Sequence, residues 1–411
     1  MFNFELTHEQ KLAREMTRKF MEREVEPVVD EMDEHKLLPY DLMRKFLDEV
    51  QGSTQLETAD DLAAYNLERD FITKALVSIE SSRVSQGFVL SMGASLELAG
   101  YAIYYAGTRE QVERWAVPIY RGDKLGSWGL TEPEAGSDAQ GMKTNARRDG
   151  DDYILSGQKI FITNAPYADT FVIYARAPGG ITAFVLERGM DGLTTSEPFD
   201  KMGHRASPTG AIYMDEVRVP AENRLGEEGK GFWYALNNLN HERAYTPCMM
   251  IGGMERCIEE AAKYAKERVQ FGKPIIKFQG VQFMLARMWE KLIASYGMLF
   301  TLGEMESKGL DITATASAAK TFATESFTQV ALDAIQIMGG YGYMKEYKVE
   351  RFMRDAKLME IGAGTTQIQL SIMARQLMNM EHPLELSPLF AGKTIFSRMP
   401  EWLAKEGKHE T

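Results

Sequence analysis

The spacing of apolar residues changes twice along this chain of 411 residues. Up to about residue 124, apolar side chains recur at helical intervals, as they do from Glu9 to Val28. Between Trp128 and Arg218, short alternating runs are separated by Gly, Pro, Asp and Asn, which is typical of strands joined by turns. Helical spacing returns at Gly231. The pattern predicts an α+β protein in which a small antiparallel β domain lies between two helical domains.

These changes in spacing set the expected domain boundaries. An N-terminal helical domain is predicted over residues 1–124, a middle β domain over 125–228, a C-terminal helical domain over 229–380 and a polar tail over 381–411. The predicted helices cover residues 9–28, 41–49, 61–81, 87–105, 109–119, 231–269, 276–308, 312–339 and 364–380. The predicted strands include residues 153–155, 170–174, 182–186 and 211–214. Because either helical end alone would leave apolar faces in water, we expect the two ends to pack together.

The composition excludes several classes of function. A net charge of −12 argues against nucleic acid as a partner, because phosphates repel an acidic surface. No apolar run approaches the roughly 20 residues that span a bilayer, and no basic segment precedes an apolar stretch at the N-terminus. We therefore expect a cytoplasmic protein without membrane insertion. The histidines lack the spacing of metal ligands, and Cys248 and Cys257 are too far apart along a helix for a disulfide, so buried thiols and no metal are expected.

Two polar segments of the middle part contain residues suited to contact a flat ligand. The run from Trp128 to Asp138 combines small residues and a proline with hydroxyls, so its backbone can approach a ring closely. In the second segment, Phe161 and Thr163 alternate on a predicted strand and therefore point the same way. One would cover a ring while the other donates a hydrogen bond to it. Each segment by itself is also what an ordinary polar loop or strand contains.

Three further segments follow in the C-terminal part. Residues 268–274 place Arg268 beside an aromatic residue at a helix end, which suits a pyrophosphate next to an adenine. Residues 336–343 contain three glycines that let the backbone approach a ligand. In residues 361–369, Thr365 can cap a helix whose first amides face an anionic or polar group. Taken singly, these segments are also ordinary helix ends and turns.

In this order and at these distances, the five segments closely resemble the acyl-CoA dehydrogenase family over roughly residues 1–380. The resemblance implies an FAD-dependent enzyme that converts an acyl-CoA thioester into a 2-enoyl-CoA. It implies a homotetramer, built as a dimer of dimers, in which a neighbouring subunit also contacts each FAD. It further implies an electron-transfer flavoprotein as the acceptor and a role in fatty acid or aromatic acid degradation.

The resemblance also assigns contacts to individual residues. Around the isoalloxazine of FAD it places Trp128, Leu130, Thr131, Phe161 and Thr163, with Thr365 and Gln367 on the other side of the flavin. Ser137 would contact both FAD and the CoA chain. At the adenosine and diphosphate of a neighbour's FAD it places Arg268, Phe271, Gln279, Gln336, Gly339 and Gly340. At the acyl-CoA it places Asn240, Arg243, Ala363, Gly364 and Arg375.

The base must be a carboxylate, because the reaction removes a proton from the α carbon of the thioester. Many family members carry a Glu directly before the Gly-Thr of the fifth segment, where this chain has Ala363. A branch that resembles isovaleryl-CoA and long-chain acyl-CoA dehydrogenases places its base on another helix, just before an Arg. This chain has Glu242 before Arg243, so Glu242 is predicted to be the base, with Glu360 as the second candidate. The N–H of Ala363 is expected to donate to the thioester oxygen.

The acyl group itself is less constrained. Because Gly362 and Ala363 are small, the pocket is expected to admit a branched, cyclic, aromatic or dicarboxylic acyl group. Residues 51–58 depart from the Gly-rich sequence that borders the acyl end in the family. Arg83 is expected either on the surface or pointing inward, where it would pair with a distal carboxylate.

Three alternatives stay open at the level of the sequence. An acyl-CoA oxidase or an enoyl-CoA reductase would share the fold and differ in what reacts with the flavin. A non-catalytic flavoprotein subunit would agree with Ala363, although the Glu242–Arg243 pair argues against it. Reduction of the bound flavin by an acyl-CoA separates the enzymes from the non-catalytic protein.

Overall fold

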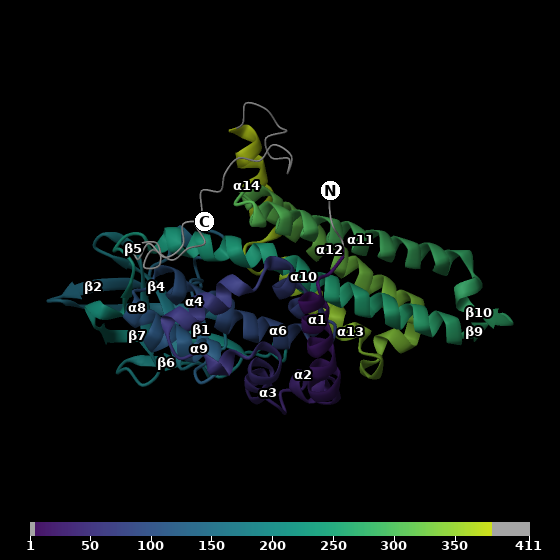
Figure 1. Cartoon of the computed structure of the whole chain (residues 1–411), viewed down its shortest axis with the longest axis horizontal. Coiled ribbons are helices and arrows are strands. Elements are labelled where there is room, and N and C mark those ends of the chain that lie inside the picture. The colour runs from purple at the N-terminus through teal and green to yellow at the C-terminus, as the bar shows by residue number, and fades with distance from the viewer. Residues whose placement is uncertain (1–4, 380–411) are drawn as a thin grey trace.

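The computed structural model describes residues 5–379, which form a helical region, a β region and a second helical region in chain order (Figure 1). This arrangement confirms the predicted α+β class. The predicted tail over residues 381–411 lies outside the described residues.

The N-terminal region consists of short helices whose starts are set by capping side chains. Thr7 accepts a hydrogen bond from the N–H of Gln10 at 3.2 Å, and Asp70 accepts one from the N–H of Thr73 at 2.6 Å. The α-helices are α1 (His8–Phe20), α2 (Val29–Asp33), α3 (Tyr40–Phe46), α4 (Ala59–Glu68), α5 (Phe71–Ser82), α6 (Gln86–Gly93), α7 (Tyr101–Ala106), α8 (Arg109–Gln111) and α9 (Val117–Arg121). Wider π turns lie at η1 (Met21–Val25), η3 (Leu47–Gln51), η5 (Ala94–Gly100) and η6 (Val112–Ala116), and 3-10 turns at η2 (Glu26–Val28) and η4 (Ser53–Gln55).

The single helix predicted over residues 61–81 is wrong. Arg69 adopts an extended conformation, with φ −96° and ψ 103°, and Asp70 then caps a new helix. The apolar spacing continues across this break because α4 and α5 both bury one side, so periodicity alone does not reveal it.

The β region contains β1 (Gly126–Gly129), β2 (Asn145–Asp149), β3 (Asp152–Thr163), β4 (Thr170–Ala177), β5 (Gly180–Glu187), β6 (Leu193–Thr195), β7 (Thr209–Val219) and β8 (Arg224–Leu225). The strand order is β6-β7-β3-β2-β4-β5-β8, and β1 pairs with β4. The prediction of an antiparallel sheet is wrong in part, because β1 runs parallel to β4, with Trp128 beside Val172. The β2–β3 hairpin separates the two strands in sequence, so their connection is a crossover, which permits parallel pairing.

The C-terminal region is dominated by the long helices α10 (Gly231–Glu267), α11 (Gln279–Ser307) and α12 (Thr313–Met338), which lie side by side (Figure 1). A two-stranded hairpin of β9 (Val269–Gln270) and β10 (Lys273–Pro274) joins α10 to α11. The chain ends with η10 (Gly339–Tyr343), η11 (Lys345–Tyr347), α13 (Val349–Met359) and α14 (Thr366–Met378), which projects from the body of the molecule. Helix α13 was not predicted.

Two cores hold these regions together. One apolar core contains Phe88 of α6, Met254 of α10 and Phe327 of α12, which confirms that the two helical ends pack together. The second core lies in the sheet and contains Tyr153 and Phe171. The thiols of Cys248 and Cys257 are buried and free, as predicted. None of the helices in residues 5–379 is both long and apolar enough to cross a membrane.

Candidate active site

Glu242 lines a cavity of about 150 Å³ between α10 and the N-terminal helices. On α10, Glu242, Tyr245, Thr246 and Met249 all line this cavity, because residues three, four and seven positions apart share one face of a helix. Most of the opposite wall is apolar and consists of Val77, Val89, Met92, Leu96 and Met359. A hydrocarbon chain can therefore lie beside the Glu242 carboxylate out of contact with water.

The Glu242 carboxylate is poorly solvated. Its Oε2 atom is buried and has no hydrogen-bond partner among residues 5–379. Burial raises the pKa of Glu242 above its usual value, and the positive charges of Lys320 and Arg243 offset part of this rise. A dehydrated carboxylate is a stronger base than a hydrated one, so the position suits the removal of a weakly acidic proton.

Asn240 and Arg243, both predicted to bind substrate, lie beside the loop that carries Ala363. Arg243 is buried, and its Nη1 donates to Oδ1 of Asn240 at 3.0 Å. Its Nε donates to the carbonyl oxygen of Ala363 at 3.3 Å. Ala363 has a φ of +53° and its neighbour Gly364 a φ of +92°, so the loop has an unusual backbone path that these contacts maintain.

Lys320 holds the same loop from the other side and was missed in the sequence. This lysine of α12 is buried, and its Nζ donates to the carbonyl oxygens of Gly362 and Gly364, the latter at 2.6 Å. Burial lowers the pKa of Lys320 to about 8. The available signal was a single charged residue that follows directly on a run of small ones, residues 314–319, within the helix predicted over residues 312–339.

Two other sequence-level candidates are engaged elsewhere. Glu360 accepts a hydrogen bond from Oγ1 of Thr328 at 2.5 Å and one from Nζ of Lys357 at 2.7 Å, and it does not line the cavity. Arg83 does not line the cavity: its half-buried side chain, 13% exposed, pairs with Glu255 at 2.7 Å and Glu259 at 2.6 Å. Arg83 therefore pairs with acidic residues of α10 at a half-buried position, and the expectation that it points into the acyl pocket was wrong.

The residues predicted around the isoalloxazine lie where β1 and its continuation meet β3. The N–H of Ile160 donates to the carbonyl oxygen of Thr131 at 3.0 Å, and Oγ of Ser127 donates to the carbonyl oxygen of Thr163 at 2.9 Å. Lys159 donates to the carbonyl oxygen of Leu130 at 3.1 Å. These bonds bring together Trp128, Leu130, Thr131, Phe161 and Thr163, while Ser137 lies exposed on the following loop.

The backbone conformation and the exposure of Phe161 suit contact with the face of a flat ring. Its φ is +60°, at a shift in the register of β3 against β7, and its side chain is 67% exposed. Bulges of this kind re-aim a side chain, and a Phe in this conformation is strained. A large apolar side chain held out in this way fits the face of a flat ring system.

The residues predicted at the adenosine end lie far from this group. Arg268 follows α10, and its guanidinium lies 5.8 Å from the centroid of the Tyr341 ring, next to Gly339 and Gly340. At both glycines the space that a Cβ would occupy is open, and Phe271 is 93% exposed. An open, cationic and aromatic surface fits a dinucleotide. The helix between Asn240 and Arg268 spans roughly 40 Å, so these residues also lie far from the substrate residues Asn240 and Arg243. The sheet and the β9–β10 hairpin next to Arg268 lie at opposite ends of the molecule (Figure 1).

The remaining predicted residues belong to α14 or begin α11. Oγ1 of Thr365 accepts a hydrogen bond from the N–H of Ile368 at 3.3 Å and so caps α14 as expected. Gln367 and Arg375 are exposed on α14, and Gln279 is exposed at the start of α11. Among the described residues, no hydrogen bond connects Arg375 with Asn240 or Arg243.

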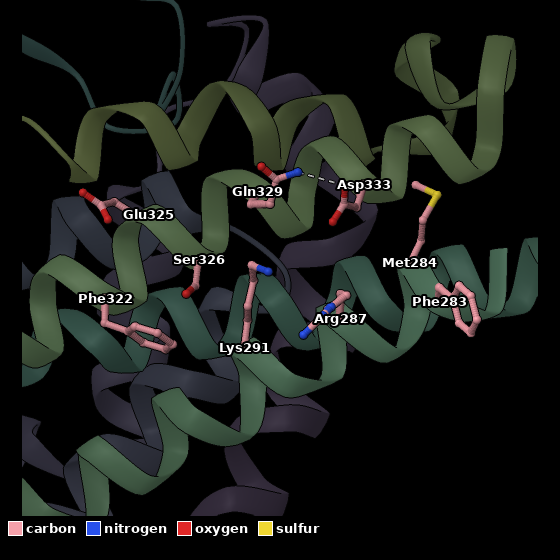
Figure 2. Close-up of a pocket in the computed structure, with 9 residues that line it drawn as sticks. All are labelled: Phe283, Met284, Arg287, Lys291, Phe322, Glu325, Ser326, Gln329 and Asp333. Carbon is pink, nitrogen blue, oxygen red and sulfur yellow. Dashed lines mark hydrogen bonds between the residues drawn. The ribbon is translucent and has the colours of Figure 1, made fainter. Parts of the chain in front are cut away.

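A second hollow lies between α11 and α12. Figure 2 shows this open groove, about 640 Å³ in volume, with Arg287 and Lys291 on α11 and Glu325, Gln329 and Asp333 on α12. It is lined by none of the predicted catalytic or substrate residues, so the chemistry is assigned to the cavity at Glu242.

Comparison with known proteins agrees with this geometry. Family models for the acyl-CoA dehydrogenase N-terminal, middle and C-terminal domains match residues 7–123, 127–217 and 229–378. A probable acyl-CoA dehydrogenase of Bacillus subtilis (strain 168) is 40% identical over 382 residues, which cover 92% of this chain and 100% of that protein. A subunit of the caffeyl-CoA reductase-Etf complex of Acetobacterium woodii is 37% identical over 378 residues, which cover 90% of this chain and 99% of that protein.

Among solved structures, butyryl-CoA dehydrogenase from Megasphaera elsdenii superposes with a TM-score of 0.87 at 36% identity, covering 92% of this chain and 100% of that one. The three domain matches together extend over most of the chain. The chain therefore belongs to the acyl-CoA dehydrogenase family and is an FAD-dependent oxidoreductase that acts on acyl-CoA.

Proposed function

We propose that the protein removes two hydrogens from the α and β carbons of an acyl-CoA thioester, giving a 2-enoyl-CoA, with Glu242 as the base. The observation that carries this proposal is the Oε2 atom of Glu242, which lies buried without a hydrogen-bond partner among residues 5–379 at an apolar cavity. Its raised pKa favours proton uptake from a carbon acid.

The neighbouring residues have separate tasks in this proposal. Among the described residues the N–H of Ala363 donates no hydrogen bond, so it can donate to the thioester oxygen and stabilise the charge that develops there. Arg243 and Lys320 hold the carbonyl groups of the loop and so orient that N–H. Their positive charges also favour the carboxylate form of Glu242. When bound, FAD supplies the acceptor for the β-hydride at its N5 atom.

The assembly is proposed to be a homotetramer, a dimer of dimers. The sheet that carries Phe161 and Thr163 and the β9–β10 hairpin next to Arg268 lie at opposite ends of the molecule (Figure 1), so a dinucleotide bound at the sheet would not reach Arg268 or Phe271 of the same chain. A neighbouring chain that places its Arg268 end there would complete the site. The mixed charges of the groove in Figure 2 suit contact with another subunit.

The proposed acceptor is an electron-transfer flavoprotein, in agreement with the Etf complex to which the Acetobacterium relative belongs. The proposed acyl group is branched, cyclic, aromatic or dicarboxylic, because Gly362 and Ala363 leave room near the α and β carbons. Cytoplasmic location and a role in fatty acid or aromatic acid degradation stay predictions of the sequence.

A reductase is the second candidate, because that relative is named as a caffeyl-CoA reductase. The same residues would then run the reaction in reverse, with Glu242 giving its proton to the α carbon of an enoyl-CoA. The direction depends on the redox partner, and an oxidase would differ by the reaction of its reduced flavin with oxygen.

The test is an anaerobic visible spectrum of the purified holoenzyme during titration with a panel of acyl-CoA thioesters. We expect bleaching of the flavin by the wild type, loss of bleaching in Glu242→Gln with FAD retained, and normal bleaching in the matched control Glu360→Gln. Fast bleaching by Glu242→Gln would exclude Glu242 as the base. Admission of oxygen and, separately, addition of a reduced electron donor with an enoyl-CoA distinguish the oxidase and the reductase.

A further inference from the structure

The cavity at Glu242 is large enough to hold a six-membered aromatic ring. Its volume of about 150 Å³ is comparable to that of a protein cavity that accommodates benzene. A group of that size would pack against the apolar walls, and empty space there would forfeit packing contacts.

Several walls of the cavity are flat and aromatic. The ring of His241 is stacked on Tyr101, with centroids 4.3 Å apart and planes within 5°, and lies 5.0 Å from Tyr245. Nε2 of His241 lies 3.0 Å from Oε2 of Glu97, which fixes the imidazole. His241, Tyr245 and Tyr65 all line the cavity, so an acyl ring would meet other rings.

The wall formed by α4 and η3 is polar instead. The hydroxyl of Tyr65 donates to Oε1 of Gln51 at 2.5 Å and accepts from Nη1 of Arg69 at 2.8 Å. Nη2 of Arg69 donates to the carbonyl oxygen of Gln51 at 2.5 Å, and the guanidinium lies 4.2 Å from the Tyr65 ring centroid. Burial raises the pKa of Tyr65 to about 12, so its hydroxyl stays protonated.

This wall offers more hydrogen-bond donors than the protein itself uses. Nδ2 of Asn66 is buried and has no hydrogen-bond partner in the described part of the chain, although Asn66 lines the cavity. Arg69 makes fewer hydrogen bonds to the described residues than its guanidinium can make. Buried donors left without acceptors cost free energy, and a site built in this way rejects ligands that lack the acceptor.

We infer that the substrate is a thioester whose acyl group ends in a ring that carries an oxygen acceptor, a hydroxyl or a carboxylate, near Asn66 and Arg69. The inference rests on the proposed function and narrows its acyl group. The ring lies between the aromatic walls, its oxygen accepts hydrogen bonds from the α4 wall, and the α and β carbons remain at Glu242. Arg69 attracts an acceptor with negative charge, whereas the carboxylate of Glu97, which lines the same cavity, repels one, so both kinds of acceptor are compared.

The test compares four thioesters in anaerobic single-turnover reduction of the holoenzyme flavin: butanoyl-CoA, 3-phenylpropanoyl-CoA, 3-(4-hydroxyphenyl)propanoyl-CoA and 3-(4-carboxyphenyl)propanoyl-CoA. We expect at least one of the two thioesters with an oxygen substituent to reduce the flavin about tenfold more efficiently than 3-phenylpropanoyl-CoA, which has an unsubstituted ring. We expect 3-phenylpropanoyl-CoA in turn to reduce the flavin more efficiently than butanoyl-CoA. In Asn66→Leu and Arg69→Met, the ratio of the reduction efficiencies of the substituted thioester and 3-phenylpropanoyl-CoA should fall toward one. Asn145→Leu, at an exposed Asn of β2, should keep the wild-type ratio.

The outcomes separate this inference from the proposed function. Reduction by butanoyl-CoA as efficient as by every aromatic thioester would overturn the inference and leave the dehydrogenation intact. A preference that persists in both variants would also overturn it, since the acceptor would then be recognised elsewhere. If no thioester reduces the flavin, both proposals fail. The wild-type panel decides the question even if a variant does not fold.

Discussion

Lys320 of α12 donates a hydrogen bond to the carbonyl oxygen of Gly364 at 2.6 Å and a second one to the carbonyl oxygen of Gly362. One buried cation thus holds the residues on both sides of Ala363, whose N–H is the proposed donor to the thioester. The positive charge of Lys320 also keeps the pKa of Glu242 below the value that burial alone would produce. Lys320 therefore acts on the base and on the oxygen site without contacting the substrate in our proposal, as a positioning residue.

Replacement of this lysine, Lys320→Met, should slow flavin reduction about 100-fold, because a shift of about 1 Å in a catalytic group has an effect of that order. The acid limb of the pH–rate profile should move to higher pH, because the lost positive charge had favoured the carboxylate of Glu242. Stopped-flow reduction across pH measures both effects. Lys308→Met, which removes an exposed lysine paired with Glu304, is the control. An unchanged pH profile would assign Lys320 a purely structural role.

Glu242→Gln should increase stability at neutral pH while it abolishes activity. The pKa of Glu242 is raised in the folded state, so the folded protein binds more protons than the unfolded one between the unfolded pKa and the folded pKa. The wild type therefore loses stability as pH rises through that window, whereas the Gln variant does not. We expect a higher Tm for Glu242→Gln at pH 7 and equal values near pH 4 by calorimetry. A lower Tm at pH 7 would contradict the burial of an unpaired carboxylate.

Lys159→Met should destabilise the β region by about 3–5 kcal/mol, because it leaves the Glu132 carboxylate buried without its cation. Nζ of Lys159 lies 2.7 Å from Oε1 of Glu132, and both side chains are buried. Denaturant unfolding with FAD bound measures the change. Lys143→Met removes an exposed partner of Glu134 in the same loop and should change stability by less than about 1 kcal/mol. Equal effects of the two variants would refute this assignment.

Gly364→Ala should impair both the loop and substrate binding. The φ of +92° disfavours a side chain, and the new Cβ would lie 2.8 Å from Nε2 of Gln369 and 3.3 Å from Nη2 of Arg243. We expect a loss of about 1–2 kcal/mol in unfolding free energy and weaker acyl-CoA binding in a spectral titration. Gly297→Ala, at a position in α11 with nothing within 4 Å, should not reduce stability. Unweakened acyl-CoA binding by Gly364→Ala would show that the loop adjusts freely.

The order of helical, β and helical regions can be predicted from the sequence alone, since each region repeats its apolar residues at the period of the structure it forms. The burial of Cys248 and Cys257 and the capping of α14 by Thr365 were also predicted correctly, because both depend on local pattern. The resemblance singled out Glu242, because the base and the Arg beside it are adjacent in the chain.

Features that join residues far apart in the sequence could not be predicted and follow from the packing of the fold. The parallel pairing of β1 with β4, the approach of Lys320 to the loop at Ala363 and the pairing of Arg83 with Glu255 all join different elements. The raised pKa of Glu242 and the unpartnered amide of Asn66 arise because other elements exclude water from these side chains. The periodicity of the sequence does not show which elements do so. Local pattern specifies which face of an element is buried, whereas packing specifies its neighbours there, and the chemistry of the site follows from those neighbours.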